Sequence, residues 1–279
     1  MKCRLCGAEA RPLGDRGDIT LHRCRACGFV SGSPVGPEIG EPYYDDYYPA
    51  DLPPPPYQRY EEWLARAEAE VGRGQLLEVG AGSGGLARTA LRRGWTVEAT
   101  EVSRSGVELL RAARVSVFRG GVEEAHYADG RFDLVASIEV LEHLAAPVEH
   151  LRELSRVTRT GGLLLLTTPN FNGLSRRWMG LRWRVIDPEH LGYFTGSTLQ
   201  GALRQAGYRD VKVRSRSLDV STWLKPPVGG GSVRFDPQAS AQLRDTVQAQ
   251  PALQVVKEGL NALLGLTGLG DSLLVWARK

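Results

Sequence analysis

The chain has 279 residues, of which 42% are apolar and 24% are charged, and its formal net charge is +3. This length can bury a full core, and the composition is that of an ordinary globular protein. No apolar run approaches the ~20 residues of a membrane span, and the basic N-terminus leads into cysteines instead of a signal-peptide core. We therefore expect a cytoplasmic protein, and the small net charge argues against nucleic acid as its partner.

All four cysteines lie near the N-terminus, in two Cys-x-x-Cys pairs with 17 residues between them. They are Cys3, Cys6, Cys24 and Cys27. This spacing is typical of a four-thiolate zinc site, whereas two disulfides or four free thiols are the alternatives. A cytoplasmic setting disfavours the disulfides. Because four protein ligands leave Zn²⁺ no open position, we expect a structural zinc ribbon over residues 1–35.

Residues 36–56 form a Tyr- and Pro-rich stretch that ends in four consecutive prolines. Proline continues neither a helix nor a central strand, so we expect a stiff, extended connector. Four tyrosines, Tyr43, Tyr44, Tyr47 and Tyr48, are more rings than a simple spacer needs. They either pin the linker onto the following domain or form part of a lid over its ligand.

From residue 57 to residue 279, strand-like apolar runs alternate with helix-like segments, which is the order of a parallel doubly wound α/β sheet. The expected strands are 75–80, 96–101, 115–118, 132–137, 162–168, 210–217 and 272–278. The expected helices lie near 60–71, 84–93, 104–113 and 148–158, and residues 218–271 form an insertion between the last two strands. Leucines near the end of this insertion either belong to a helix packed over the site or offer an apolar surface to a lipid-linked substrate.

A glycine-rich turn follows the first strand of this sheet, with Glu78 inside the strand and Gly80, Gly82 and Gly84 after it. Glycine lets the backbone take a positive φ and lets a ligand approach the main chain. Glu101, at the end of the next strand, can bind the two hydroxyls of a ribose. A carboxylate at Glu78 would repel a pyrophosphate but attract an ammonium group, which favours a nucleoside that carries an amino acid.

This order of Glu and three spaced glycines resembles the first motif of class I S-adenosylmethionine-dependent methyltransferases. The fourth strand leads into Val140-Leu141-Glu142-His143, which resembles the same family. The resemblance implies a seven-stranded Rossmann-like sheet that binds S-adenosyl-L-methionine. Gly121 stands where the family usually has an acidic residue, so a backbone contact from Val122 to the adenine is expected. The implied cofactor-binding residues are Glu78, Gly80, Gly82, Gly84, Glu101, Val102, Gly121, Val122 and Ser137.

A long loop after the fifth strand carries the sequence Glu189-His190-Leu191-Gly192-Tyr193-Phe194-Thr195. It resembles a segment of methyltransferases of deoxysugar and glycan biosynthesis, in some of which the His, with its neighbouring Glu, is the general base. We predict that His190 is the base and that Glu189 orients its ring. Alternatively, His190 only caps the loop. His143 is a second catalytic candidate, unless it pairs with Glu139 four residues earlier on a helix.

These features predict methyl transfer to a small-molecule or glycan acceptor, with a hydroxyl of a sugar or secondary metabolite expected, including a nucleotide- or lipid-linked one. A zinc-ribbon RNA methyltransferase is a competing hypothesis, and it would need a basic face on the ribbon. The arginines that could form this face are Arg4, Arg11, Arg16, Arg23 and Arg25. A nicotinamide-dependent oxidoreductase and a non-catalytic cofactor-binding partner protein are two more hypotheses that the motifs allow.

Overall fold

The computed structural model describes residues 1–33, 45, 48, 58–218 and 251–279, with the side chains of 251–258 excepted. Most of the predicted linker and most of the predicted insertion therefore lie outside the described residues. The chain divides into two compact units. The first unit comprises 1–36, 168–199 and 213–274, and the second comprises 37–167, 200–212 and 275–279. The predicted domains follow the order of the sequence, whereas each unit combines segments that are distant in the chain.

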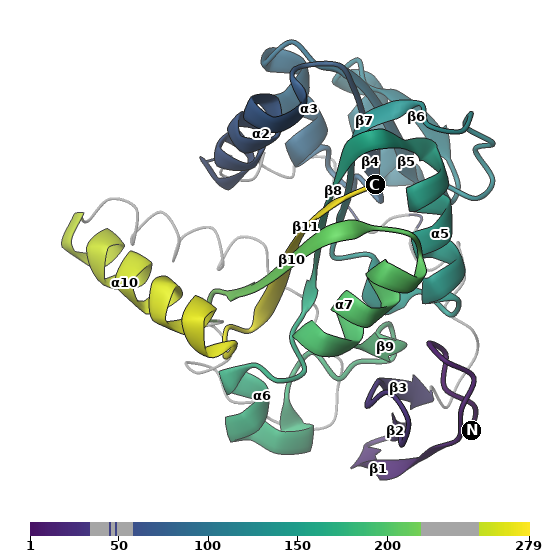
Figure 1. The fold of residues 1–279 in the computed structure, drawn as a ribbon, viewed down its shortest axis with the longest axis vertical. Coiled ribbons are helices and arrows are strands. Elements are labelled where there is room, and N and C mark those ends of the chain that lie inside the picture. Colours follow the sequence, from purple (N-terminus) through teal and green to yellow (C-terminus); the bar gives the residue numbers. More distant parts are fainter. Residues whose placement is uncertain (34–44, 46–47, 49–57, 219–250) are drawn as a thin grey trace. The chain divides into compact units, whose positions relative to one another are not determined.

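The large sheet has seven strands in the order β10-β11-β8-β7-β4-β5-β6 (Figure 1). The strands are β4 (Gln75–Val79), β5 (Thr96–Glu101), β6 (Ser116–Arg119), β7 (Phe132–Ile138), β8 (Thr158–Pro169), β10 (Arg209–Arg216) and β11 (Ser272–Arg278). The pairs β4–β5, β4–β7, β5–β6 and β7–β8 are parallel. All seven predicted strands are confirmed, although β8 begins earlier than predicted.

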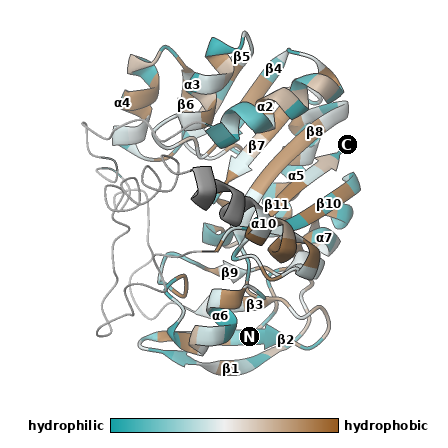
Figure 2. Ribbon diagram, turned by 90° about the vertical axis from the view of Figure 1, so that its left-hand side faces the viewer, coloured by the Kyte–Doolittle hydropathy of each residue, from teal (hydrophilic) through white to brown (hydrophobic). Residues whose placement is uncertain are grey.

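The central strands are apolar because both of their faces are covered. In β8 the run Leu163–Leu166 is buried, and Figure 2 shows this strand in the colour of hydrophobic residues. In β7, Leu134, Val135 and Ala136 are likewise inaccessible to solvent. Such runs cannot alternate between apolar and polar residues, which is why the sequence shows them as continuous apolar stretches.

The four predicted helices are present as α2 (Gln58–Val71), α3 (Gly85–Arg92), α4 (Arg104–Ala112) and α5 (Pro147–Val157). Helix α4 begins where the Oγ atom of Ser103 accepts a hydrogen bond from the amide of Gly106 at 2.9 Å, and α5 begins with a proline at its first turn. Further helices are α6 (Leu174–Met179), α7 (Gly196–Gln205) and α10 (Pro251–Thr267). Short 3₁₀ turns lie at η1 (Leu141–His143) and η2 (Gly180–Arg182).

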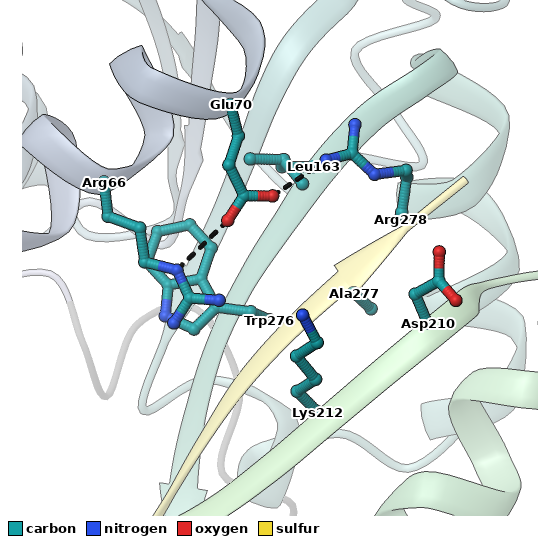
Figure 3. A pocket seen from close by; sticks show the side chains of 8 residues that line it. All are labelled: Arg66, Glu70, Leu163, Asp210, Lys212, Trp276, Ala277 and Arg278. Carbon is teal, nitrogen blue, oxygen red and sulfur yellow. Dashed lines mark hydrogen bonds and ion pairs between the residues drawn. The ribbon is translucent and has the colours of Figure 1, made fainter.

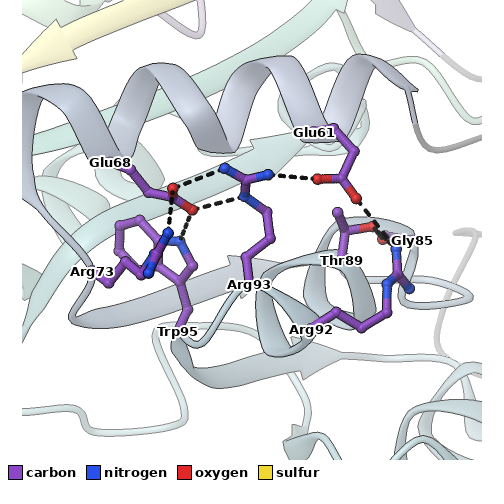
Figure 4. Close-up of polar contacts among 8 residues, drawn as sticks. All are labelled: Glu61, Glu68, Arg73, Gly85, Thr89, Arg92, Arg93 and Trp95. Carbon is purple, nitrogen blue, oxygen red and sulfur yellow. Dashed lines mark hydrogen bonds and ion pairs between the residues drawn. The ribbon is translucent and has the colours of Figure 1, made fainter.

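Helix α2 is attached to the end of α3 by an ionic network (Figure 4). The guanidinium of Arg93 donates two hydrogen bonds to Glu68, at 2.7 and 2.8 Å, and one to Glu61 at 2.8 Å. The indole nitrogen of Trp95 donates to Glu68 at 3.1 Å. These donors lower the pKa of Glu68 to about 2, with the Arg93 bonds as the largest cause. Bidentate Arg–carboxylate pairs of this kind fix geometry as well as charge.

A second, four-stranded sheet lies in the first unit, in the order β1-β2-β3-β9. Its strands are β1 (Ala10–Arg16), β2 (Ile19–Cys24), β3 (Val30–Ser33) and β9 (Gly192–Tyr193). Strand β9 comes from the long loop after β8 and pairs antiparallel with β3, with Val30 opposite Tyr193. The N-terminal ribbon therefore incorporates a strand from a distant part of the chain.

One hydrophobic core joins the N-terminal sheet to the long loop within the first unit. Side chains of β2 and β3 pack there with aromatic side chains of the loop, and Phe171 and Trp183 meet edge to face with centroids 6.4 Å apart. The core residues are Ile19, Leu21, Val30, Phe171, Met179, Trp183, Ile186 and Tyr193. Among the described helices, none combines the length and the apolar character needed to cross a membrane.

Candidate functional site

The glycine-rich turn after β4 follows a path that only glycine takes without strain. Gly80, Gly82 and Gly84 have φ angles of 65°, 55° and 78°. A Cβ atom on Gly80 would lie 2.5 Å from the side chain of Val140, and one on Gly82 would lie 2.6 Å from the hydroxyl of Tyr48. The three glycines thus allow both the turn and the close approach of neighbouring groups to its backbone.

Glu101, at the end of β5, binds this turn directly. Its Oε2 accepts a hydrogen bond from the amide of Gly82 at 2.7 Å, and its Oε1 accepts one from the amide of Ser103 at 2.9 Å. Burial raises the pKa of Glu101, and the backbone hydrogen bonds oppose that rise. A carboxylate has about four acceptor sites, so the bonds from backbone amides leave capacity for a ribose hydroxyl.

Glu78 lies inside the sheet, with its Oε2 accepting a hydrogen bond from the amide of Ala87 at 2.8 Å. It thereby satisfies a donor in the first turn of α3. Burial raises the pKa of Glu78 to about 8, the bond from Ala87 lowers it, and the charge of Glu101 raises it. A cation bound beside these two carboxylates would relieve their repulsion. This gives an electrostatic basis to the prediction that Glu78 contacts the ammonium group of the ligand.

Two buried hydroxyls lie near the carboxyl ends of the central strands. Ser137, in β7, is fully buried, and Thr167, in β8, is nearly so. Within the described part of the chain, neither hydroxyl has a hydrogen-bond partner. Buried polar groups are normally paired, so these hydroxyls fit contacts to a polar ligand at this edge of the sheet.

The predicted adenine segment follows β6. Val122 is buried, and the amide of Gly121 donates a hydrogen bond to the Oε2 atom of Glu124 at 2.9 Å. The carbonyl of Val102, after β5, accepts a bond from Arg119 at 3.5 Å. The position of Gly121 predicts no carboxylate at this place, yet Glu124, three residues further on, reaches back to the Gly121 amide.

The described residues of the tyrosine-rich stretch, Asp45 and Tyr48, contact the same unit as the glycine turn. The amide of Tyr48 donates to the hydroxyl of Ser105 at 3.1 Å, and the carbonyl of Asp45 accepts from the amide of Ser105 at 3.0 Å. The Asp45 carboxylate forms an ion pair with Arg119 at 2.7 Å. The linker is therefore pinned at these points, with the Tyr48 hydroxyl beside Gly82.

The segment after β7 differs from the expected helix. Glu139 has a φ of 54°, and only Leu141–His143 forms a 3₁₀ turn. The predicted helical spacing of Glu139 and His143 is therefore wrong, because Glu139 has a left-handed backbone conformation and lies outside the short 3₁₀ turn. A left-handed non-glycine residue is uncommon and is concentrated at functional sites, which keeps this segment among the candidates.

The four cysteines come together at one end of the first unit. Their Sγ atoms all lie within 4.8 Å of one another, with three contacts at 3.5 to 3.6 Å. A tetrahedral zinc with Zn–S bonds of about 2.3 Å has sulfurs about 3.8 Å apart. The amides of Leu5 and Cys27 also donate hydrogen bonds to the Sγ atoms of Cys3 and Cys24. The geometry fits one Zn²⁺ with four thiolate ligands.

His190 lies in the first unit, next to β9. Its Nδ1 forms a hydrogen bond of 2.6 Å with the carbonyl of Val185. Its own amide donates to the carbonyl of Asp187 at 3.0 Å, and the amide of Glu189 donates to the Asp187 side chain at 3.0 Å. His143 and the glycine turn belong to the second unit.

The glycine turn and the carboxylate that binds it lie in a part of the chain that matches a known family. Residues 55–213, more than half of the chain, match the model of the family described as a methyltransferase domain. The chain belongs to this family of methyltransferase domains. The matched range includes the glycine turn, Glu101, both catalytic histidine candidates and β4 to β9.

Curated relatives of this methyltransferase domain are similar over part of their length. An Escherichia coli ubiquinone biosynthesis O-methyltransferase is 31% identical over 127 residues, which are 42% of this chain and 50% of that protein. A probable S-adenosylmethionine-dependent methyltransferase of Mycobacterium tuberculosis is 29% identical over 157 residues, 56% of each chain. The chain thus spans about half the length of the curated relatives it matches.

Solved structures show the same fold. The phosphoethanolamine N-methyltransferase 2 of Haemonchus contortus, in complex with S-adenosyl-L-methionine, aligns with a TM-score of 0.58 at 17% identity, over 90% of this chain and 62% of that one. The α/β methyltransferase fold expected from the sequence is therefore confirmed. The four-cysteine ribbon lies outside the range that the family model matches.

One described pocket has a volume of about 210 Å³, and Figure 3 shows the side chains that line it. Charged side chains that line the pocket pair with one another: the Glu70 carboxylate forms ion pairs with both Arg66 and Arg278. The Arg66 guanidinium also stacks over Trp276, with its carbon 4.5 Å from the ring centroid. None of the predicted site residues lines this pocket.

Proposed function

We propose that this protein transfers a methyl group from S-adenosylmethionine to a hydroxyl of a small-molecule acceptor. The observation that carries the proposal is the bond between Glu101 and the Gly82 amide, because it joins the two predicted cofactor anchors in a methyltransferase domain. Glu101 would hold the ribose, and the backbone of the glycine turn would face the amino-acid part. The buried hydroxyls of Ser137 and Thr167 supply further polar contacts at the same edge.

Bound S-adenosylmethionine supplies an electrophilic methyl group on a sulfonium. The protein must hold an acceptor oxygen in line with that carbon and must remove its proton. We assign the removal of this proton to His190. A neutral imidazole whose Nδ1 donates to a carbonyl carries its lone pair on Nε2, which can accept the proton. The bond to Val185 fixes the ring in the tautomer that a base requires.

The acceptor class is supported by the relatives, whose printed names include O-methyl transfer in ubiquinone biosynthesis. Three exposed leucines of α10, Leu260, Leu263 and Leu266, favour an acceptor with an apolar portion. The phosphoethanolamine N-methyltransferase is similar in fold alone and therefore adds no support for an amine acceptor. A glycan hydroxyl stays within the proposal because the Glu189-His190 segment resembles that of sugar-modifying enzymes.

We further propose that the four cysteines hold one structural Zn²⁺. The sulfur geometry supports this assignment, and four thiolates leave no open coordination position for a substrate. The metal therefore contributes to folding of the N-terminal sheet and not to the chemistry.

The activity is tested by incubating the purified protein with S-adenosylmethionine and single acceptors. Catechol, a nucleoside diphosphate sugar, phosphoethanolamine and total RNA represent the competing classes, and formation of S-adenosylhomocysteine is measured with each. We expect product with a hydroxyl compound and none with phosphoethanolamine. Product with RNA would instead support the RNA methyltransferase. Calorimetric binding of a nicotinamide dinucleotide in place of S-adenosylhomocysteine would overturn the proposal.

The role of His190 is tested with the acceptor that gives product. His190→Ala should lower kcat by roughly 10²-fold or more and leave the affinity for S-adenosylhomocysteine unchanged, since loss of a general base affects the chemical step alone. His143→Ala, which changes the second candidate for the general base, is the control. If His143→Ala abolishes turnover and His190→Ala does not, the base is His143.

A further inference from the structure

Arg16, the last residue of β1, binds three backbone carbonyls of the long loop through one nitrogen, Nη1. They are the carbonyls of Trp183 at 2.7 Å, Arg184 at 3.4 Å and Ile186. The remaining carbonyl of this stretch, that of Val185, accepts the bond from Nδ1 of His190 at 2.6 Å. The backbone carbonyls of residues 183–186 therefore all accept side-chain hydrogen bonds, three from Arg16 and one from His190.

This contact is built into the core of the first unit. Arg16 is half-buried, and burial lowers its pKa while the charge of Asp187 raises it. Beside it, Trp183 and Ile186 pack with β2 and β3 in the shared hydrophobic core. The amide of Gly32 in β3 also donates to the carbonyl of Leu191 at 3.1 Å, directly after His190. The N-terminal sheet thus contacts the loop both before and after the histidine.

The arrangement determines the direction in which the ring can act. Peptide units are planar, so holding the carbonyls on both sides of Val185 limits rotation of the unit that carries its oxygen. That oxygen in turn orients the imidazole and keeps the hydrogen on Nδ1, which places the lone pair on Nε2. A carbonyl partner on the other nitrogen is the usual means by which proteins select the working nitrogen of a histidine.

We propose that Arg16 is a positioning residue for His190: its hydrogen bonds to the carbonyls of Trp183, Arg184 and Ile186 keep the Val185 oxygen in place to hold the base in its Nδ1-protonated tautomer. The inference rests on the proposed role of His190 as general base. With Arg16 in this role, the N-terminal sheet that carries the cysteines contributes to the reaction, because its strand β1 places Arg16 against the loop. Sequence reasoning had counted Arg16 only among the arginines of a possible RNA-binding face.

The test measures the histidine ring by nuclear magnetic resonance and needs no acceptor. Protein labelled with ¹⁵N-histidine is recorded above the titration range of its rings, and the His190→Ala spectrum assigns the His190 signals. We expect wild type to show a protonated Nδ1 and an unprotonated Nε2. In Arg16→Met both ring nitrogens should move toward the average of the two tautomers. Arg16→Lys, which keeps the charge but lacks the planar fork, should show an intermediate change.

Arg11→Met is the matched control, because Arg11 is exposed on the same strand. Zinc content and S-adenosylhomocysteine affinity should be unchanged in all three variants, which separates positioning from unfolding. With an active acceptor, Arg16→Met should lower kcat by roughly 10- to 100-fold, the scale of a misplaced catalytic group. In the His190→Ala background the same change should have no further effect.

Two results would overturn the inference: a His190 tautomer that is unchanged in Arg16→Met and Arg16→Lys, or a wild-type ring protonated on Nε2. Failure of the proposed function is a different result, namely full turnover in His190→Ala. In that case the tautomer could still respond to Arg16, and Arg16 would orient a histidine that is not the base.

Discussion

At the scale of single residues, Glu101 connects two parts of the site that are far apart in the sequence. One of its oxygens binds the Gly82 amide and the other binds the Ser103 amide. The turn after β4 and the start of α4 therefore depend on one carboxylate. Burial raises the pKa of this carboxyl against the opposing effect of its backbone hydrogen bonds, and a bound ribose would add donors that favour the charged form.

We predict that Glu101→Ala weakens S-adenosylhomocysteine binding by about 1.5–3 kcal/mol, the scale of a lost charged hydrogen-bond partner. Isothermal calorimetry measures this change. Glu101→Gln, which keeps one acceptor oxygen, should lose less affinity. Glu98→Gln, on the same strand but paired with Arg131, is the control and should bind normally. Equal affinities for Glu101→Ala and wild type would show that the ribose is not held here.

The Glu78 carboxyl predicts a pH dependence of stability in the absence of cofactor. Its pKa is raised to about 8 by burial, so the folded state holds a proton that the unfolded state releases near the ordinary value of 4.5. Its contribution is fully present below pH 4.5 and is lost as pH rises toward 8.

Chemical denaturation at several pH values should show wild type losing stability on the order of a few kcal/mol from about pH 5 to about pH 8, and Glu78→Gln losing less, since only Glu101 of the two carboxyls still titrates there. Gln keeps an acceptor for the Ala87 amide, so helix α3 stays capped. Bound S-adenosylhomocysteine, whose ammonium would lie near Glu78, should reduce the loss in wild type. Identical pH profiles for the two proteins would contradict the raised pKa.

At the scale of elements, the attachment of α2 to α3 depends on Glu68. It accepts from Arg93 and from Trp95, and its pKa is lowered to about 2. A lowered folded-state pKa stabilises the protein above the unfolded value of 4.5, and this contribution disappears as pH falls toward 2. The helix that precedes the first strand of the large sheet is thereby fixed through charge and not only through its apolar face.

Glu68→Gln should destabilise the protein by about 2 kcal/mol near neutral pH, because two charge-assisted bonds lose their anion. The difference from wild type should shrink between pH 4.5 and pH 2, as the wild-type carboxyl takes up its proton. Glu62→Gln, exposed on the same helix, is the control. Thermal denaturation checks both variants, and a loss that persists unchanged in acid would point to packing rather than charge.

At the scale of the whole molecule, the N-terminal sheet and the long loop are one folding unit. They share a hydrophobic core. Strand β9 is the last strand of the four-stranded sheet whose strand β2 ends at Cys24. Metal binding at the cysteines should therefore stabilise more than the N-terminal ribbon alone. The glycine turn, Glu101 and β4 belong to the second unit.

Removal of zinc with a chelator, or Cys24→Ser, should remove about one metal ion per chain and expose the backbone of both 1–33 and 183–194 to hydrogen exchange. Protection in β4 and β5, and the affinity for S-adenosylhomocysteine, should change little. Mass spectrometry of exchanged peptides provides the readout. Less than about a tenth of an equivalent of zinc in protein purified without chelator would reject the metal site.

Local patterns were sufficient for the seven strands of the large sheet, for helices α2 to α5 and for the glycine turn. Strands and helices follow from the periodicity of apolar side chains, and the left-handed φ values of Gly80, Gly82 and Gly84 follow from the spacing of residues that lack a Cβ. The failure at Glu139 has a local origin as well. A non-glycine residue in a left-handed conformation carries no signal in the sequence, so the segment looked helical.

By itself, the sequence determined the individual strands of the methyltransferase sheet, the glycine turn and the two Cys-x-x-Cys motifs, because each is encoded by a short run of residues. Only the tertiary structure decided that β9 joins the N-terminal sheet, that Glu124 reaches Gly121 and that Tyr48 lies beside Gly82. The bonds from Arg16 to the carbonyls of Trp183, Arg184 and Ile186 are contacts of the same kind. Such contacts arise from chain segments that meet only when the core has formed, and no spacing in a single sequence encodes them.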